Sequence, residues 1–195
     1  MIAGEPTDGQ TPLDPDEAEG LIPSHIETRG ELNEWEQANI AEALDWLSRR
    51  RTSETVLSLE FLRELHRRMF GKTWRWAGTF RTTGKTLGIT ASQIPEALKN
   101  LIENTKYQVR AGVPPQDEIA MRFHHELVRI HPFANGNGRH GREMTDQLLS
   151  ELGCPPFTWG SVRLDVAGTA RSAYIAALRL ADRGTFEALR AFVRT

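Results

Sequence analysis

The chain has 195 residues, 26% of them charged, and a net charge of −2, which suits one domain with a substantial core and excludes the basic footprint of a nucleic-acid-binding protein. Its single cysteine, Cys154, excludes an internal disulfide and favours the reducing cytoplasm as its location. No signal peptide and no apolar run long enough to cross a bilayer is found, so we expect no membrane among its partners. From the net charge, we also expect no nucleic acid among them.

Residues 1–20 are rich in proline, glycine and acidic residues and predict a loosely held N-terminal tail. The rest of the chain, residues 21–195, is predicted to form a single helical domain. Apolar residues at helical spacing predict helices over 31–50, 58–70, 94–110, 117–130, 139–152, 166–181 and 184–193. In the first of these helices, the apolar stripe is expected to include Leu32, Trp35, Ile40, Leu44 and Leu47.

One segment between the helices has a different pattern. Residues 82–90 are rich in threonine and are interrupted by Gly84 and Gly88, which predicts a short β-hairpin. The fold class is therefore predicted to be all-α with one small β-hairpin. An ordinary surface hairpin without a functional role is the alternative for this segment.

The stretch 131–142 carries most of the chemistry in the chain. Pro132 ends the helix before it, because the residue preceding a proline is disfavoured in the α region, and the second half of the stretch begins the next helix. A helix start has unpaired N–H groups and a partial positive charge, so it favours anions. Gly136 and Gly138 allow the backbone to approach phosphate oxygens closely.

Two arginines and a histidine complete this stretch. Arg139 and Arg142 lie three positions apart near one helical face, where arginine opposes the helix dipole unless an anionic ligand compensates. Pairing with local acids such as Glu143 or Asp146 is the alternative. His131, with an ordinary pKa of about 6.5, can accept a proton from an attacking hydroxyl. The residues alone thus predict a polyphosphate site beside a general base.

With these residues the stretch meets every fixed position of the signature of Fic-domain proteins, and the chain resembles that family. Residues 76–78 (WAG), 80–81 (FR) and 94–95 (IP) are also similar to the family, so the resemblance covers roughly residues 55–155. More narrowly, the chain resembles the small Fic proteins found near mobile elements and often called mobile mystery protein B. The resemblance implies a Fic-type helical bundle.

The resemblance further implies an adenylyltransferase that transfers AMP from ATP to a Ser, Thr or Tyr hydroxyl of a target protein. His131 would be the base, and Phe133 would anchor the loop. Mg²⁺, bridging two phosphates, would be bound at Asn135; most members have an acid there, so we expect weaker metal binding and slower activity. The residues that would bind the phosphates are Gly136, Asn137, Gly138, Arg139 and Arg142.

The same resemblance makes the 82–90 hairpin a flap that clamps an extended segment of the target by strand addition. Its docking residues would be Thr82, Thr83, Gly84, Lys85, Thr86 and Leu87. Many Fic proteins also hold a glutamate against the second motif arginine, which blocks the γ-phosphate. The usual inhibitory pattern is absent here, and Glu31 comes closest to it. A solvated glutamate at a helix start is the alternative, as is an antitoxin partner that supplies the glutamate.

Other functions within this resemblance stay open. The transferred group could be UMP or phosphocholine, or the reaction could be the removal of AMP from a modified protein. A different class of function is a toxin-like module that mainly binds an antitoxin protein and whose catalysis is weak or lost. The intact His131 and both arginines argue against a loss of catalysis.

Overall fold

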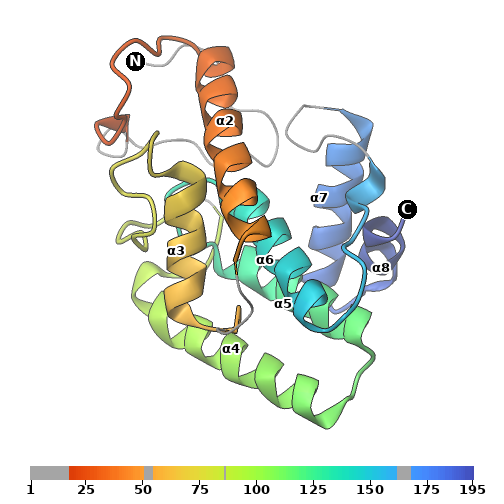
Figure 1. Ribbon diagram of the computed structural model, residues 1–195. Coiled ribbons are helices and arrows are strands. Elements are labelled where there is room, and N and C mark those ends of the chain that lie inside the picture. Colours follow the sequence, from red (N-terminus) through yellow and green to blue (C-terminus); the bar gives the residue numbers. More distant parts are fainter. Residues whose placement is uncertain (1–17, 51–54, 86, 162–167) are drawn as a thin grey trace.

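Helices α5 and α6 lie at the centre of the molecule and the other helices pack around them (Figure 1). The computed structural model describes residues 18–50, 55–85, 87–161 and 168–195, so the predicted tail lies almost wholly outside the described residues. The α-helices of the described residues are α2 (Arg29–Ser48), α3 (Leu59–Phe70), α4 (Ile94–Ala111), α5 (Gln116–Ile130), α6 (Asn137–Glu151), α7 (Thr169–Ala181) and α8 (Glu187–Val193).

The packing of these helices places α6 between two layers. Helices α2 and α3 pack on each other, and α3 also contacts α6, whereas α4 packs on α5. On the opposite side α7 and α8 form a pair, and α8 contacts α5 (Figure 1). Short 3-10 turns at Ala91–Gln93 and Trp159–Ser161 complete the described structure. This mainly helical architecture confirms the predicted fold class, except for the hairpin.

Local signals set the helix boundaries, which agree with the predicted ones to within three residues. Thr28 caps α2 through its hydroxyl, which accepts from the Glu31 N–H, and Ser58 caps α3 in the same way at Phe61. Gly112, in the left-handed region at φ 67°, ends α4. The start predicted for the seventh helix, at residue 166, lies outside the described residues.

The buried face of α2 differs from the predicted stripe. Trp35 and Leu44 are exposed, at 40% and 42% of their surface. The buried face instead includes two polar residues, Glu36 and Asn39. The Asn39 side-chain oxygen accepts from the Lys72 N–H at 3.0 Å, so this face of α2 satisfies polar groups of the segment after α3 as well as packing against it.

The predicted β-hairpin is not found in the part of 82–90 that the structure describes, which has no strand; Thr86 lies outside it. The physical reason is that the backbone N–H groups at its two ends donate hydrogen bonds to another segment of the chain. Arg81 N–H donates to the Pro132 carbonyl at 2.9 Å, and Ile89 N–H donates to the Ile130 carbonyl at 3.4 Å. The two ends therefore pair with the last residue of α5 and with the loop after it rather than with each other.

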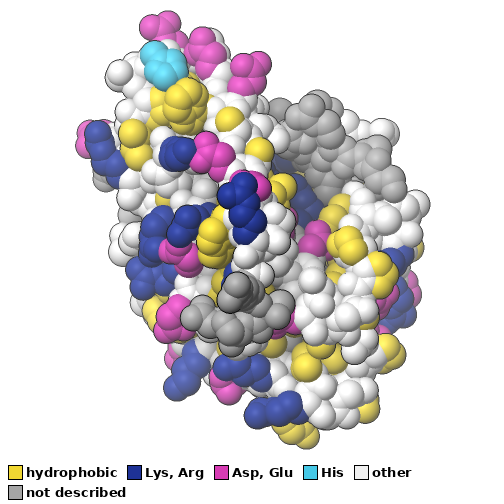
Figure 2. Space-filling model, in the orientation of Figure 1, with side chains coloured by type: hydrophobic (Ala, Val, Ile, Leu, Met, Phe, Trp, Pro, Cys, Tyr) yellow, Lys and Arg dark blue, Asp and Glu magenta, His cyan; other side chains and the backbone are white. Residues whose placement is uncertain are grey.

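The surface agrees with the near-neutral composition. Charged side chains of both signs are interspersed on the face shown in Figure 2, which has no continuous patch of one sign. None of the helices within the described residues combines the length and apolar character needed to span a membrane. These observations leave the loop between α5 and α6 as the place to look for function.

Candidate active site

The loop 131–136 joins the end of α5 to the start of α6 through two residues in the left-handed region. His131 has φ 54° and ends α5, and Gly136 has φ 79° and begins α6. A β-carbon at Gly136 would lie 2.6 Å from the ring of Phe70, so glycine is required there on two grounds. The chain thereby turns sharply enough to present the N-terminus of α6 beside the loop.

The Asn137 side chain holds the loop closed from inside. Its carbonyl oxygen accepts from the Phe133 N–H at 2.9 Å, and its amide donates to the Phe133 carbonyl at 2.8 Å. Phe133 is fully buried, which confirms that its side chain points into the core as predicted. Asn137 itself is only 3% exposed. Its side chain therefore shapes the phosphate loop, in addition to any contact with a phosphate.

We expect Asn137→Ala to destabilise the protein by about 1–3 kcal/mol for each of the two Phe133 backbone groups, because both become buried without a partner. Urea unfolding of the two proteins measures this difference. Asn137→Asp keeps an acceptor for the Phe133 N–H but places a buried carboxylate oxygen against the Phe133 carbonyl, so it should also be less stable than the native protein. An alanine variant as stable as the native protein would contradict this role.

A second buried side chain, His66 of α3, supports the loop from the other side. The Gly78 N–H donates to His66 Nδ1 at 3.0 Å, which places the ring proton on Nε2, and Nε2 donates to the Asn135 carbonyl at 3.1 Å. The ring stacks on Phe133 with centroids 3.6 Å apart. Burial holds the pKa of His66 well below its usual value, so the ring is neutral and this tautomer persists.

His131, the predicted base, is 7% exposed. Its Nδ1 lies 3.3 Å from the Val128 carbonyl, which makes Nδ1 the donor and leaves Nε2 as the proton acceptor. Burial, together with the positive charges of Arg81 and Lys85 and against the opposing effect of the Val128 hydrogen bond, lowers the pKa of His131 to about 4. The imidazole is therefore neutral at neutral pH, as a general base must be.

Arg139, the first motif arginine, is already paired in the structure. Its guanidinium lies 2.7 Å from Glu36 Oε2, and the Glu36 side chain is only 3% exposed. The other Glu36 oxygen accepts from the Trp74 indole N–H at 2.7 Å. Arg139 also lies over the Phe70 ring, 4.9 Å from its centroid. A buried carboxylate thus occupies one side of the predicted phosphate-binding arginine.

Glu31, the residue closest to the inhibitory pattern, lies at the start of α2 as a capping residue. Glu31 is exposed, and its carboxylate accepts from the backbone N–H groups of Glu27 and Thr28 in a capping box at the start of α2. These bonds lower the pKa of Glu31. The acid that reaches a motif arginine is Glu36, five residues later on the buried face of α2, and it contacts the first arginine of the motif rather than the second.

Arg142, the second motif arginine, faces Tyr174 of α7. Burial lowers the pKa of Arg142, against the charge and hydrogen-bond contribution of the Tyr174 hydroxyl. That hydroxyl also lies 2.7 Å from His124 Nε2. Helix α7 thus contributes a side chain to the motif, a contact that the sequence did not indicate because α7 lies far from the motif along the chain.

A pocket of ≈ 210 Å³ lies beside the two arginines, lined from α6 by Arg139, Arg142, Glu143 and Asp146 and from α2 by Gln37 and Ile40. Burial raises the pKa of both Glu143 and Asp146, and Arg142 opposes this rise. The positive charge of Arg142 therefore acts on both acids considered as its local partners. The pocket nevertheless presents two guanidinium groups from the first turns of α6, which suits an anionic ligand.

Asn135, at the predicted metal position, has its side-chain oxygen turned back on the loop, where it accepts from the Gly136 N–H at 2.6 Å. Residues 131–142 contain no carboxylate. No group of three or more His, Cys, Asp or Glu side chains that could bind a metal occurs within the described ranges. This donor set fits a cation held mostly by the phosphates of a nucleotide, with one neutral protein oxygen added.

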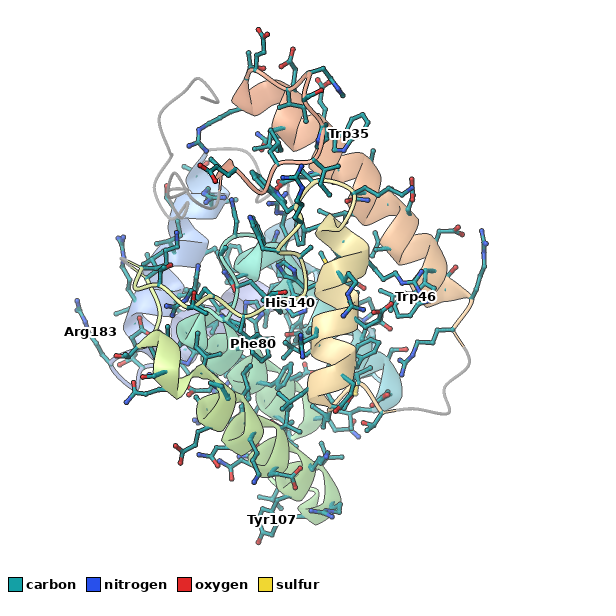
Figure 3. All side chains as sticks on the ribbon, turned by 90° about the vertical axis from the view of Figure 1, so that its left-hand side faces the viewer. Trp35, Trp46, Phe80, Tyr107, His140 and Arg183 are labelled. Atoms are coloured by element: carbon teal, nitrogen blue, oxygen red, sulfur yellow. The ribbon has the colours of Figure 1, made fainter. Side chains whose placement is uncertain are left out.

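The described residues of the predicted flap lie at the surface near this site. Thr82, Thr83, Gly84 and Leu87 are exposed and Lys85 is half-buried, whereas Thr86 lies outside the described residues. The flap and the motif therefore adjoin each other, as expected. Figure 3 shows His140 of the motif in the interior of the molecule, whereas Tyr107 of α4 points outward. Phe80, which leads into the flap, is partly buried and packs against the core.

Comparisons with known proteins agree with this geometry. Residues 56–149 match the sequence profile of the Fic/DOC family. The chain is 32% identical over 143 residues to a Caenorhabditis elegans protein named protein adenylyltransferase fic-1, and the match covers 71% of the chain and 26% of that protein. The chain thus spans about a quarter of the length of this relative.

Solved structures show the same fold. The structure of Fic-1 (residues 134–508, E274G) from C. elegans superposes with a TM-score of 0.62 at 27% identity, covering 91% of the chain and 51% of that structure. The BepC protein from Bartonella tribocorum, solved with bound AMPPNP, superposes with a TM-score of 0.71 at 19% identity, covering 92% and 96%. The helical arrangement around the loop is therefore shared with both.

Proposed function

The chain carries a Fic/DOC domain over residues 56–149, and from this premise we propose that it is a protein adenylyltransferase that transfers AMP from ATP to a hydroxyl side chain of a target protein. The observation that carries the proposal is the neutral, buried His131 on the same loop as two arginines and the start of α6. The name of the worm relative and the AMPPNP bound to BepC support it.

The proposed reaction is an in-line displacement at the α-phosphorus. The target hydroxyl attacks this atom while His131 Nε2 takes the hydroxyl proton, and pyrophosphate leaves with the electrons of the broken P–O bond. Gly136, Gly138 and the N-terminus of α6 would hold the phosphates through backbone N–H groups. Arg139 and Arg142 would bind the outer phosphates, so that catalysis depends mainly on positioning and neutralisation.

The exposed flap residues Thr82, Thr83, Gly84 and Leu87, together with the half-buried Lys85 and with Thr86, would dock the extended segment of the target beside this site. Without a strand in the described part of 82–90, such docking would require the flap to extend when the target binds. A cytoplasmic location, as predicted from the single cysteine, belongs to this proposal.

The test is incubation with ATP labelled at either the α- or the γ-phosphate, in the presence of cell lysate. Adenylyl transfer predicts protein labelled from the α-phosphate alone. Label from the γ-phosphate would instead indicate phosphoryl transfer and would overturn the proposal. Labelled UTP, run in parallel, tests uridylyl transfer in the same way.

The proposal includes Mg²⁺ bound between Asn135 and the nucleotide phosphates, where it would neutralise phosphate charge when present. Asn135→Asp is expected to lower the Mg²⁺ concentration for half-maximal AMP transfer by about fivefold, because a charged ligand contributes roughly 1 kcal/mol more than a neutral one. Titration of Mg²⁺ at fixed ATP measures this. Asn33→Asp, a surface change on α2, is the control; an equal response of both variants would contradict the assignment.

We also propose that the chain inhibits its own AMP transfer and that Glu36 provides this inhibition, because its carboxylate forms an ion pair with the guanidinium of Arg139. Binding of the β- or γ-phosphate to Arg139 would require this ion pair to open. A toxin role with an antitoxin partner is the second candidate, and it is favoured by the neutral Asn135, which weakens the expected activity. A relation to the mobile mystery protein B group would fit that role.

A further inference from the structure

Arg81 lies just before the flap, is 6% exposed, and donates its guanidinium hydrogen bonds to backbone carbonyls on both sides of the site. Its Nε donates to the His131 carbonyl at 2.7 Å. Its Nη1 donates to the Thr83 carbonyl at 2.8 Å, and its Nη2 to the Ile89 carbonyl at 2.5 Å. A single side chain therefore joins the backbone of the predicted base to both ends of the flap.

We propose that Arg81 is a positioning residue that couples the flap to the catalytic base, so that a target docked on the flap and the orientation of His131 are set together. The inference rests on the proposed function. It follows from the rigidity of the guanidinium fork, whose N–H groups have fixed directions, so the carbonyls of Thr83, Ile89 and His131 cannot move independently.

Gly88 brings the flap against His131 from the other side. It has φ +97°, and a β-carbon there would lie 2.5 Å from the His131 Cβ and 2.7 Å from Arg81 Nη2. Only glycine permits this approach. The backbone pairing of Arg81 with Pro132, at 2.9 Å, closes the same contact. The flap is thus packed on the base itself and not only beside it.

Charge adds a second coupling between the same parts. The charged groups that act on the His131 imidazole are Arg81, before the flap, and Lys85, within it. Both disfavour the protonated ring. A flap that moves away with its lysine, or that loses Arg81, is therefore expected to make His131 a stronger base as well as a less well oriented one.

The test separates geometry from charge with two variants. Arg81→Lys keeps the charge but loses the fork, and Arg81→Gln loses both. In either variant, amide hydrogen exchange of residues 87–90 is expected to accelerate about 10- to 150-fold, as for lost charge-assisted hydrogen bonds. NMR titration should show the pKa of His131 raised in Arg81→Gln and still low in Arg81→Lys. AMP transfer should fall in both, with the affinity for AMPPNP unchanged.

Arg63→Lys is the matched control. Arg63 Nε donates to the Gly78 carbonyl at 2.9 Å, ahead of the flap. The inference is overturned if this control accelerates exchange at 87–90 as much as the Arg81 variants, or if those variants leave it unchanged. Gly88→Ala tests the same contact with Arg81 intact, should the Arg81 variants not fold. Gly88→Ala should accelerate amide hydrogen exchange at residues 87–90 and reduce AMP transfer. Exchange at the native rate in these residues would contradict the coupling.

The proposed function can fail separately from this inference. If the native protein transfers no label from α-labelled ATP to any protein, the proposed adenylyl transfer is wrong. The exchange and titration measurements need no substrate, so they would still show whether Arg81 joins the flap to His131.

Discussion

Replacing His131 with alanine is expected to reduce AMP transfer by about 10²- to 10⁴-fold, the usual contribution of a positioned general base. The neutral imidazole is the group that removes the hydroxyl proton in the proposed reaction, and alanine has no group that can accept that proton. The measurement is protein labelling from α-labelled ATP. Binding of AMPPNP should change little, because His131 does not hold the phosphates in the proposed reaction.

His125 supplies a matched control for this variant. It is also 7% exposed, and its Nε2 lies 2.9 Å from Asp182 rather than facing the loop. His125→Ala should therefore keep most of the labelling, apart from any loss of stability. If His131→Ala labels protein as well as the native chain, the proposed mechanism is wrong. If both alanine variants lose labelling equally, the loss reports folding and not catalysis.

The pH dependence of the rate follows from the same side chain. The pKa of His131 is lowered to about 4 in the free protein, and only the neutral ring accepts a proton. The profile of kcat/KM, which reports the free protein, should therefore stay flat on the acid side until the pH falls toward 4. Bound phosphates are anionic and favour the protonated ring. The acid limb of kcat should accordingly lie at a higher pH than that of kcat/KM.

Glu36→Gln is expected to raise nucleotide affinity and AMP transfer by roughly 10- to 150-fold, the range that corresponds to one charge-assisted hydrogen bond gained by the ligand. The glutamine keeps an acceptor for the Trp74 indole but no longer attracts Arg139 as a carboxylate does. Arg139 can then bind a phosphate without breaking an ion pair. Titration with AMPPNP measures the affinity, and α-labelled ATP measures the transfer.

Glu31→Gln is the matched control, because Glu31 lies on the same helix and contacts only the helix cap. It should change neither nucleotide affinity nor labelling. Activation by Glu31→Gln with no response of Glu36→Gln would reverse the assignment made from the structure. If neither variant is activated, inhibition within this chain is excluded, and an antitoxin partner becomes the better explanation for any control of activity.

The contrast between the two glutamates shows why sequence patterns pointed to Glu31 and not to Glu36. The stripe of α2 was predicted from apolar residues, so Trp35 and Leu44 were assigned to the core, although both are exposed. The buried face instead carries Glu36, whose carboxylate meets Trp74 and Arg139. A pattern of hydrophobic residues cannot distinguish a buried polar residue from an exposed one, because the partners that permit its burial lie on distant segments.

The prediction of a β-hairpin differs from the structure for a related reason. Threonine and glycine content predicted a strand–turn–strand in 82–90, and such content does favour extended chain locally. Whether two extended segments pair depends on what else their backbone groups can reach. Here the Arg81 guanidinium donates to backbone carbonyls at both ends of the segment. The backbone N–H groups at the two ends donate to the last residue of α5 and to the loop after it. Local propensity could not reveal this competitor.

The sequence by itself determined the helices, their order and the loop 131–142, because these depend on periodicity and on residues adjacent in the chain. It also predicted His131, Arg139 and Arg142 as site residues from their spacing in this loop. The tertiary structure alone decided which groups surround them: Glu36 on Arg139, Tyr174 beside Arg142, and Arg81 on the His131 carbonyl. Burial and charge act through space, and so the pKa of the base and the state of the arginines were settled only when distant segments were packed together.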